Sequence, residues 1–259
     1  MKKPIILFLY AALLFRILPA QSQSFQYALL VGDTTRFSVS GGNGTVQWQK
    51  SPDSIRWADI TGATSNPQKI ITDTSYSGKR YFRAKIIDSL CPLTFSYSST
   101  IKYQILTSTL EMKIGYWFRG GVVFYIDGTG HGLIAATQDQ STASLWGCNS
   151  TLIGLNAQSK TKGLANTNAI VAGCINRPIA ASICDTLTLN GYTDWFLPAK
   201  DQLNLLYLQK NIVGGLSTYY YWSSTESAST SSWSQYFIDG SQGNSSKSNG
   251  FLVRAIRAF

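Results

Sequence analysis

The chain has 259 residues, and its 22 Lys and Arg outnumber its 13 Asp and Glu to give a formal net charge of +9. The basic residues are scattered rather than run together, and no nucleic-acid-binding motif is present, so we expect no nucleic-acid partner. The mild basic bias is compatible instead with acidic glycans or anionic surfaces. The four cysteines contain no Cys-x-x-Cys pair and there is one histidine, which excludes a typical zinc site. We expect neither a metal nor another cofactor.

Residues 1–22 are predicted to be a secretory signal peptide. Two lysines precede an apolar stretch at 5–18, and small residues suited to cleavage follow at Ala20 and Ser22. The apolar stretch is too short to span a membrane, and no transmembrane segment is expected further along the chain. We therefore expect the protein to be exported by a cleaved signal peptide and to be secreted or held at the cell surface.

Residues 23–107 are predicted to be an all-β domain. Apolar and polar residues alternate at 35–39, 46–49 and 81–86, and turn-forming residues separate these runs. Short alternating strands with frequent turns are typical of an antiparallel sandwich. The run from Val46-Gln47-Trp48 to Gly62-Ala63-Thr64, followed by Tyr81-Phe82-Arg83-Ala84, resembles the immunoglobulin-like repeats of bacterial surface proteins. That resemblance implies that Trp48 is the buried tryptophan of the sandwich and that the domain is a spacer.

The segment at 105–113 is predicted to join this domain to a second one at 111–259. It contains no long Gly/Ser or Pro tract, so we expect a short linker. The 85 residues of 23–107 and the 149 residues of 111–259 are each enough to form one hydrophobic core. The sequence therefore indicates two domains after the signal peptide.

The second domain begins with a predicted β-hairpin, whose strands at 121–126 and 132–136 are joined by Asp-Gly-Thr-Gly. The single histidine, His131, lies at the end of this hairpin, where we expect a structural role. Helices are then predicted at 165–174, 178–185 and 199–210.

The stretch at 191–203 organises this half of the chain. A turn at Gly191–Asp194 precedes the apolar run Trp195-Phe196-Leu197, which is long enough for one buried strand. Pro198 ends the run because it has no N–H to give to a sheet, and an amphipathic helix follows. We expect Trp195, Leu197 and Pro198 to lie in the core.

The stretch Gly-Tyr-Thr-Asp-Trp-Phe-Leu-Pro-x-Lys-Asp-x-Leu at 191–203 resembles the central motif of the Lcl C-terminal domain family. Other landmarks of that family occur in order around it, and they are Gly120-Gly121-Val122-Val123-Phe124-Tyr125, His131-Gly132-Leu133, Trp146-Gly147-Cys148, Ala165-Asn166-Thr167, Tyr221-Trp222-Ser223-Ser224-Thr225-Glu226 and Val253-Arg254-Ala255-Ile256-Arg257-Ala258-Phe259. The resemblance covers about residues 111–259.

The resemblance implies a C-type lectin-like fold, with two helices packed on a small twisted sheet and with the N- and C-terminal strands paired. The predicted fold class is therefore an all-β immunoglobulin-like sandwich followed by an α+β C-type lectin-like domain. Trp222 and Arg254 are expected in the core of that domain. The arginines near the C-terminus, Arg254 and Arg257, are expected to form ion pairs with residues such as Asp194 or Glu226.

Exported proteins keep disulfides, and Cys148, Cys174 and Cys184 are the candidates within the second domain. At least one disulfide is expected among these three cysteines. Cys91 lies in the first domain. Each domain then has one cysteine left over, which predicts either a bridge between the domains or two free thiols.

The segment from Tyr219 to Asn249 is rich in Tyr, Ser, Gly and Asn, the composition of antibody binding loops. In C-type lectin-like folds long loops in this region bind ligand. We expect exposed loops at 217–220, 227–232 and 239–250. The ligand-binding candidates are Tyr219, Tyr220, Asn244, Lys247 and Asn249.

The sequence gives little support to catalysis. The Glu-Pro-Asn, Gln-Pro-Asp and Trp-Asn-Asp triplets of calcium-dependent lectins are absent, and no cysteine follows Cys184 to supply the reactive pair of the formylglycine-generating enzymes. Glu226 and Asp239 are the two carboxylates that a glycosidase mechanism would need. Carboxylates in loops are usually solvated surface groups, so we do not expect this pair to be catalytic.

We therefore predict an exported, non-enzymatic binding or adhesion protein that recognises a carbohydrate or protein ligand on a surface. The first alternative is a structural subunit of a surface or fimbrial assembly that binds sister subunits. The second is an enzyme of the formylglycine-generating branch.

Overall fold

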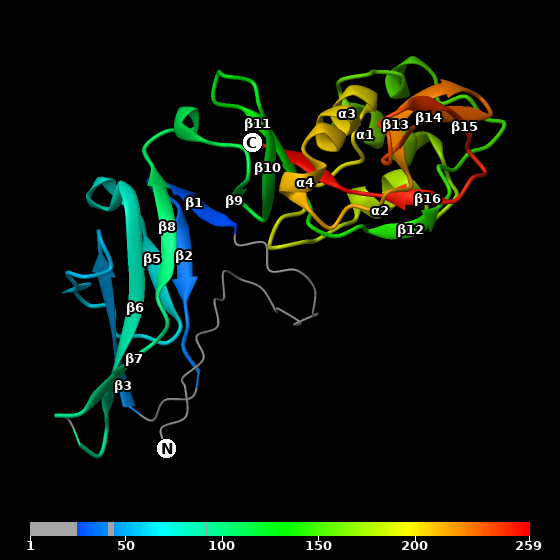
Figure 1. Cartoon of the computed structure of the whole chain (residues 1–259). Helices are drawn as coiled ribbons and strands as arrows, with labels where there is room; N and C mark the ends of the chain where they lie inside the picture. Colours follow the sequence, from blue (N-terminus) through cyan, green and yellow to red (C-terminus); the bar gives the residue numbers. More distant parts are fainter. Residues whose placement is uncertain (1–24, 41–43, 92) are drawn as a thin grey trace. The chain divides into compact units, whose positions relative to one another are not determined.

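The computed structural model describes residues 25–40, 44–91 and 93–259. The chain divides into two compact units, Met1–Met112 and Lys113–Phe259 (Figure 1). The division falls within the segment at 105–113 where the sequence places the junction. The predicted signal peptide lies outside the described residues. Within the described part, no helix is long and apolar enough to cross a membrane.

The first unit is built mainly of β-strands, which form two sheets. In the larger sheet the strand order is β1-β8-β6-β3-β4, with β7 paired to β6, and the smaller sheet pairs β2 with β5. The strands are β1 (Gln26–Leu30), β2 (Thr34–Phe37), β3 (Gly44–Ser51), β4 (Ala58–Asp59), β5 (Gln68–Ile71), β6 (Gly78–Asp88), β7 (Phe95–Tyr97) and β8 (Ile101–Leu106), and the short 3-10 helices are η1 (Thr74–Tyr76) and η2 (Thr109–Glu111). Most pairs are antiparallel, but β1 and β8 run parallel, which the expected antiparallel sandwich did not include.

Aromatic side chains hold the two sheets of this unit together. Phe37 on β2 lies 5.3 Å from Trp48 and 5.0 Å from Phe82, measured between ring centroids, and both of those residues belong to the larger sheet. Trp48 is fully buried and its indole Nε1 donates a hydrogen bond to the carbonyl of Ser65. Burial of rings of this size is the main favourable term in such a core.

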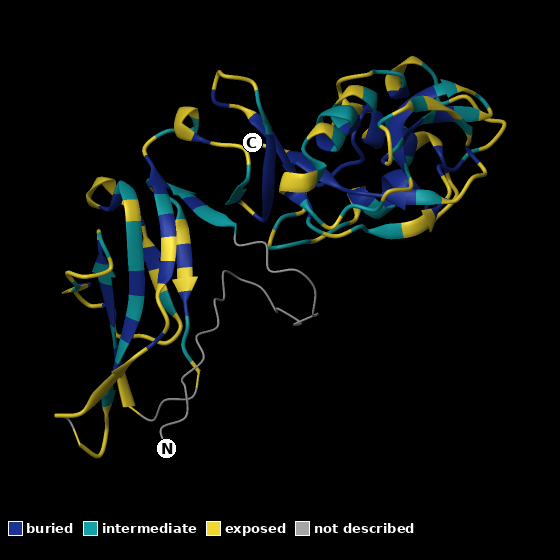
Figure 2. Cartoon of the chain, viewed as in Figure 1, coloured by how far each residue is buried: buried dark blue, intermediate teal, exposed yellow. Residues whose placement is uncertain are grey.

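The second unit contains two sheets and four α-helices. The strand orders are β17-β11-β10-β9 and β12-β16-β13-β14-β15. The strands are β9 (Tyr116–Phe118), β10 (Gly121–Ile126), β11 (Gly132–Ala135), β12 (Ser141–Ser144), β13 (Tyr220–Ala228), β14 (Ser231–Tyr236), β15 (Gln242–Ser246), β16 (Phe251–Val253) and β17 (Ile256–Ala258), and the helices are η3 (Leu155–Ala157), α1 (Gly163–Gly173), α2 (Ala180–Asp185), α3 (Lys200–Leu208) and α4 (Lys210–Val213). Helices α1 and α3 pack against the second of these sheets, and buried residues gather between them (Figure 2).

Three features differ from expectation in this unit. The last strand, β17, pairs with β11, and the first strand, β9, pairs with β10, so the terminal strands of the unit are not neighbours. The segment at 239–250 is not one exposed loop, because β15 pairs along its length with β14. The segment at 227–232 is likewise a tight hairpin, since β13 continues to Ala228 and β14 begins at Ser231.

The corner at 195–200 links several parts of the second unit. Phe196 forms an isolated bridge with Ile256 instead of belonging to a longer strand. The carbonyl of Pro198 accepts a hydrogen bond from Ser224 N on β13, and Leu197 N donates to Thr167 Oγ1 on α1. Trp195, Leu197, Pro198 and Trp222 are all buried. The corner therefore joins α1, β13 and the C-terminal strand around one core.

Candidate ligand-binding surface

The five ligand-binding candidates do not form one surface. On the second sheet Tyr220 lies opposite Tyr236, whereas Asn244 lies opposite Trp233. Side chains alternate between faces along a strand, and directly opposite residues share a face. Tyr236 and Trp233 are three residues apart on β14, so Tyr220 and Asn244 point to opposite faces of the sheet.

Tyr220 lies in the middle of a row of stacked rings. Its ring centroid is 4.5 Å from that of Tyr236 at an interplanar angle of 23°, and 5.0 Å from that of Phe251 at 19°. Strand β13 runs between β14 and β16, so these two rings cover the two faces of the Tyr220 ring. Tyr220 therefore presents an edge and not a face to a ligand. Sequence reasoning missed Tyr236 and Phe251 as neighbours, because that prediction needs the strand register.

Tyr219 is different, because it stands outside this row. The residue is 55% exposed, and its ring is almost perpendicular to those of Tyr220 (5.6 Å, 86°) and Tyr236 (6.5 Å, 77°). Since both faces of Tyr220 are covered, Tyr219 contacts that ring at its edge. The contact fixes the position of Tyr219 and leaves much of its surface open to solvent.

The opposite face of the sheet carries a second aromatic residue that is partly exposed, Trp233. The ammonium of Lys200 lies 3.7 Å from the centre of its ring, in cation–π geometry, and Asn244 is exposed on the neighbouring strand. Asn249 is also exposed, in the turn between β15 and β16, where its backbone N–H donates to the carbonyl of Ser246. Neither asparagine is brought to the Tyr219 surface by these contacts.

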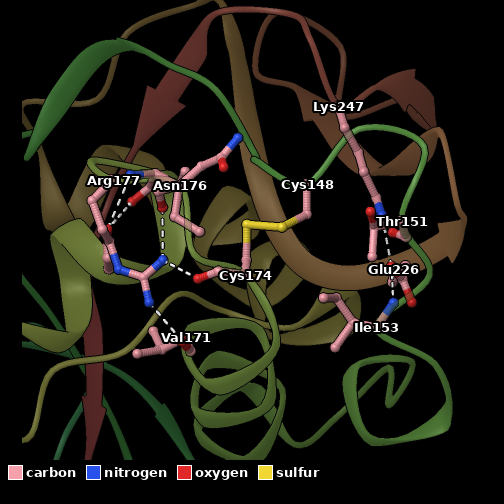
Figure 3. The surroundings of a disulfide bond; sticks show 11 residues. Cys148, Thr151, Ile153, Val171, Cys174, Asn176, Arg177, Glu226 and Lys247 are labelled. Carbon is pink, nitrogen blue, oxygen red and sulfur yellow. Dashed lines mark hydrogen bonds and ion pairs between the residues drawn. A yellow bond between two sulfur atoms is a disulfide. The ribbon is translucent and has the colours of Figure 1, made fainter.

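The prediction that Lys247 lies on an exposed loop is wrong. Its side chain has no exposed surface, and its ammonium lies 2.6 Å from Glu226 Oε1, which is equally buried (Figure 3). The same ammonium donates to the carbonyl of Thr151 at 2.8 Å and lies 4.5 Å from the ring centre of Trp146. Burial of a lysine requires such a partner, so Lys247 is held inside by Glu226.

Glu226 also fixes the loop that follows Cys148. Its two carboxylate oxygens accept hydrogen bonds from the backbone N–H groups of Ile153 and Gly154, at 2.9 and 2.7 Å. Figure 3 shows this carboxylate and the Cys148–Cys174 disulfide holding the same loop. With these donors in place, Glu226 is a structural carboxylate. The expectation that it pairs with a C-terminal arginine is wrong.

The two arginines near the C-terminus pair with other acids. Arg257 binds Asp194 through Nε and Nη2, at 2.8 and 2.7 Å, as expected. The buried Arg254 binds Asp139 at 2.8 Å, and Asp139 also accepts a hydrogen bond from the Tyr221 hydroxyl. Burial raises the pKa of Asp139 above its ordinary value, although Arg254 and Tyr221 oppose that shift.

The cysteines resolve into one disulfide and two thiols. Cys148 and Cys174 form the disulfide, with their Cα atoms 5.6 Å apart. Cys184 is a buried free thiol whose pKa is raised by burial, so it is not part of the disulfide for which it was a candidate. Cys91 is a free thiol on the surface.

Comparison with known families agrees with the C-terminal resemblance. Residues 135–257 match the Lcl C-terminal domain family. The matched segment lies entirely within the second unit and includes the disulfide, Glu226, Lys247 and Tyr219. Residues 24–105 match a different family, a domain of unknown function named DUF8696.

Comparisons with individual proteins yield fewer matches than comparisons with families. No curated protein matches the chain. Among solved structures, the chain is similar to a fimbrial protein from Bacteroides ovatus, with 12% sequence identity and a TM-score of 0.45. That alignment covers 89% of this chain and 69% of the other chain.

Proposed function

We propose that this is an exported, non-enzymatic binding or adhesion protein whose Lcl C-terminal domain recognises a carbohydrate or protein ligand around Tyr219. The observation that carries the proposal is the geometry of that tyrosine. The residue is more than half exposed, yet its ring is positioned by the edge of Tyr220. A tyrosine fixed in this way loses little conformational entropy when a ligand covers it.

The chemistry of the tyrosine suits both ligand classes. Its ring offers apolar contact to the C–H groups of a sugar or to an apolar side chain, and its hydroxyl both donates and accepts hydrogen bonds. The row formed by Tyr236, Tyr220 and Phe251 supports the ring from one side. A binding site that rests on one positioned anchor agrees with the way binding energy is distributed in most interfaces.

The domain assignments belong to the same proposal. We propose that the first unit is an immunoglobulin-like sandwich and that the second is C-type lectin-like. The proposal of a non-enzymatic role is supported by Glu226, because Lys247 and two backbone N–H groups occupy its oxygens in the interior. A carboxylate held in this way is not free to transfer protons to a substrate.

The test is a glycan array, followed by titration of each bound glycan against the full chain and its Tyr219→Ala variant. We expect the substitution to weaken binding at least about tenfold, because truncating an anchor residue costs roughly 1–2 kcal/mol or more. Asn244→Ala, on the opposite face of the sheet, is the matched control and should leave the affinity unchanged.

Two outcomes would contradict the carbohydrate version of this proposal. Equal losses in the two variants would place the ligand elsewhere on the domain. Absence of glycan binding, together with self-association that Tyr219→Ala abolishes, would identify the protein as a structural subunit of a surface assembly. Light scattering on the purified chain measures that self-association directly.

A further inference from the structure

Two basic residues project from the outward face of the larger sheet in the first unit. Along β6 the side chains of Phe82, Ala84 and Ile86 are buried in the core. Because side chains alternate along a strand, Arg83 and Lys85 point to the other face. They are two residues apart, which places them about 7 Å from each other along the strand.

The guanidinium of Arg83 is held in one orientation. It lies 4.0 Å from the ring centre of Trp57 and 3.6 Å from that of Tyr97. Its Nε donates a hydrogen bond of 2.8 Å to the side-chain carbonyl of Gln49, whose own amide group donates to Asp59. Stacking on two rings together with one directional hydrogen bond fixes both the plane and the rotation of the guanidinium.

The terminal edge of that guanidinium is reached by solvent, since no fully buried side-chain nitrogen of the described residues lacks a hydrogen bond. Arg83 donates a hydrogen bond through Nε. Its two terminal nitrogens form no hydrogen bond or ion pair with any described residue. These nitrogens form a fork that matches a carboxylate in a bidentate arrangement. A fork oriented in advance binds with a smaller entropic cost than a mobile surface arginine.

Lys85 extends the same arrangement along the face. Its ammonium lies 4.7 Å from the ring centre of Phe95, and Phe95 contacts Tyr97 edge-to-face at 5.4 Å. Phe95 and Tyr97 are 53% and 40% exposed. By strand register Lys102, opposite Tyr81, shares this face. Positively charged groups and exposed aromatic rings thus alternate on this face of the sheet. One acidic residue, Asp59, lies at the margin of the face, where it accepts a hydrogen bond from Gln49.

We propose that this face binds an acidic polysaccharide, with Arg83 and Lys85 contacting its carboxylates and with Tyr97 and Phe95 contacting its sugar rings. A polysaccharide of this kind carries negative charge and apolar C–H faces on one chain. A peptide that bound here by strand addition would need free main-chain hydrogen-bonding groups on β6. Here β6 is already paired with β3 on one side and with β8 and β7 on the other.

The experiment measures binding of the full chain to polygalacturonic acid at about 0.15 M salt, where only close charge pairs remain effective. We expect Arg83→Gln to weaken binding about tenfold, since charge-assisted hydrogen bonds are lost. Arg83→Lys should bind little better than Arg83→Gln, because an ammonium cannot form the bidentate contact that a guanidinium makes with a carboxylate. Lys85→Gln and Tyr97→Ala should each weaken binding as well. Lys69→Gln, an exposed lysine on β5, is the control and should have no effect.

Three further outcomes decide the proposal. Fully methyl-esterified polygalacturonate should not bind, because its carboxylates are neutral. Equal losses with Arg83→Gln and Lys69→Gln would reduce the binding to general charge attraction and overturn the proposed site. Binding of poly-L-glutamate as tight as that of polygalacturonate would overturn the assignment to a polysaccharide. Circular dichroism of each variant checks that the sheet remains folded.

Discussion

At the scale of single residues, the Glu226–Lys247 pair carries a large desolvation cost, because both charges lie in the interior of the second unit. Both side chains are completely buried, and removing two charges from water costs several kcal/mol per ion. The cost is offset because the carboxylate and the ammonium also bind backbone groups of the loop at 151–154. The pair thus attaches that loop to β13 and to the turn between β15 and β16.

Replacing Lys247 with methionine should destabilise the second unit by about 3–5 kcal/mol, because Glu226 would stay buried without a counter-charge. Urea unfolding followed by tryptophan fluorescence measures this change. The control is Lys160→Met, at an exposed lysine, where we expect a change within about 0.5 kcal/mol. A loss below about 1 kcal/mol for Lys247→Met would mean that water reaches Glu226.

Asp139 should give the second unit an unusual pH dependence. Burial raises its pKa in the folded state above the ordinary 3.8, so at pH values between the two pKa values the folded protein binds more protons at this position than the unfolded chain does. Stability from this residue therefore rises as pH falls through the raised pKa, and is lost as pH rises through it. Asp139→Asn cannot titrate at this position.

The free energy of unfolding of the wild type, minus that of Asp139→Asn, should therefore increase as pH is lowered from about 7 to about 4. Urea titrations of both proteins at several pH values measure this difference. A difference that shrinks on acidification would show that the Arg254 ion pair, and not burial, dominates the pKa of Asp139.

Burial of single residues follows from sequence in some cases only. Trp195, Leu197 and Trp222 lie in apolar or β-rich runs, and such side chains are buried wherever the chain folds back on them. Lys247 lies among Ser, Gly and Asn, a composition typical of exposed loops. Its burial depends on Glu226, 21 positions earlier, and only the strand register brings the two together.

At the scale of elements, the loop after Cys148 is attached at two places. The disulfide to Cys174 anchors it to the end of α1, and Glu226 anchors its middle to β13 (Figure 3). Arg177 also binds the end of α1, through the carbonyls of Val171 and Cys174. These contacts explain how a polar segment without long helices or strands keeps one conformation.

Replacing Cys148 and Cys174 together with serine should lower the free energy of unfolding by about 3–4 kcal/mol, the entropy effect of opening a loop of 26 residues. Thermal unfolding of the oxidised wild type and of the double variant measures it. Cys91→Ser is the matched control, because the Cys91 thiol is exposed and unpaired. This variant should have the melting temperature of the wild type. Equal melting temperatures for all three proteins would show that Glu226 alone holds the loop.

Helices were more predictable than the last strands. The predicted helices at 165–174, 178–185 and 199–210 correspond to α1, α2 and α3 within a few residues, because apolar spacing and helix starts are local signals. Strand β15 has no apolar residue and was expected to be a loop. Its pairing depends on backbone hydrogen bonds to β14 and on contacts such as that of Ser245 with Ser234, which composition does not indicate.

At the scale of the whole molecule, the sequence indicates two cores but not the contacts that close the second one. The alternating strands end near residue 107 and the resemblance to the C-terminal family begins near residue 111, which locates the division. Closure of the second unit depends on pairs more than a hundred residues apart, such as Asp139 with Arg254. The sequence could not separate Tyr219 from Tyr220 for the same reason, because only the strand register shows that neighbouring rings cover Tyr220 and leave Tyr219 more than half exposed.

Because each unit has its own core, a core substitution should destabilise the unit that contains it and leave the other unit unchanged. Trp195 is 1% exposed and lies at the corner that joins α1, β13 and the C-terminal strand. Trp195→Ala should therefore destabilise the second unit by about 3–5 kcal/mol. Hydrogen exchange read by mass spectrometry should show lost protection in β10, β13 and α3, with β3 and β6 of the first unit unchanged. Trp48→Ala, in the first core, should give the reverse pattern. Loss of protection in both units from either substitution would show that the chain unfolds as one cooperative body, and the division at residue 112 would then carry no thermodynamic meaning.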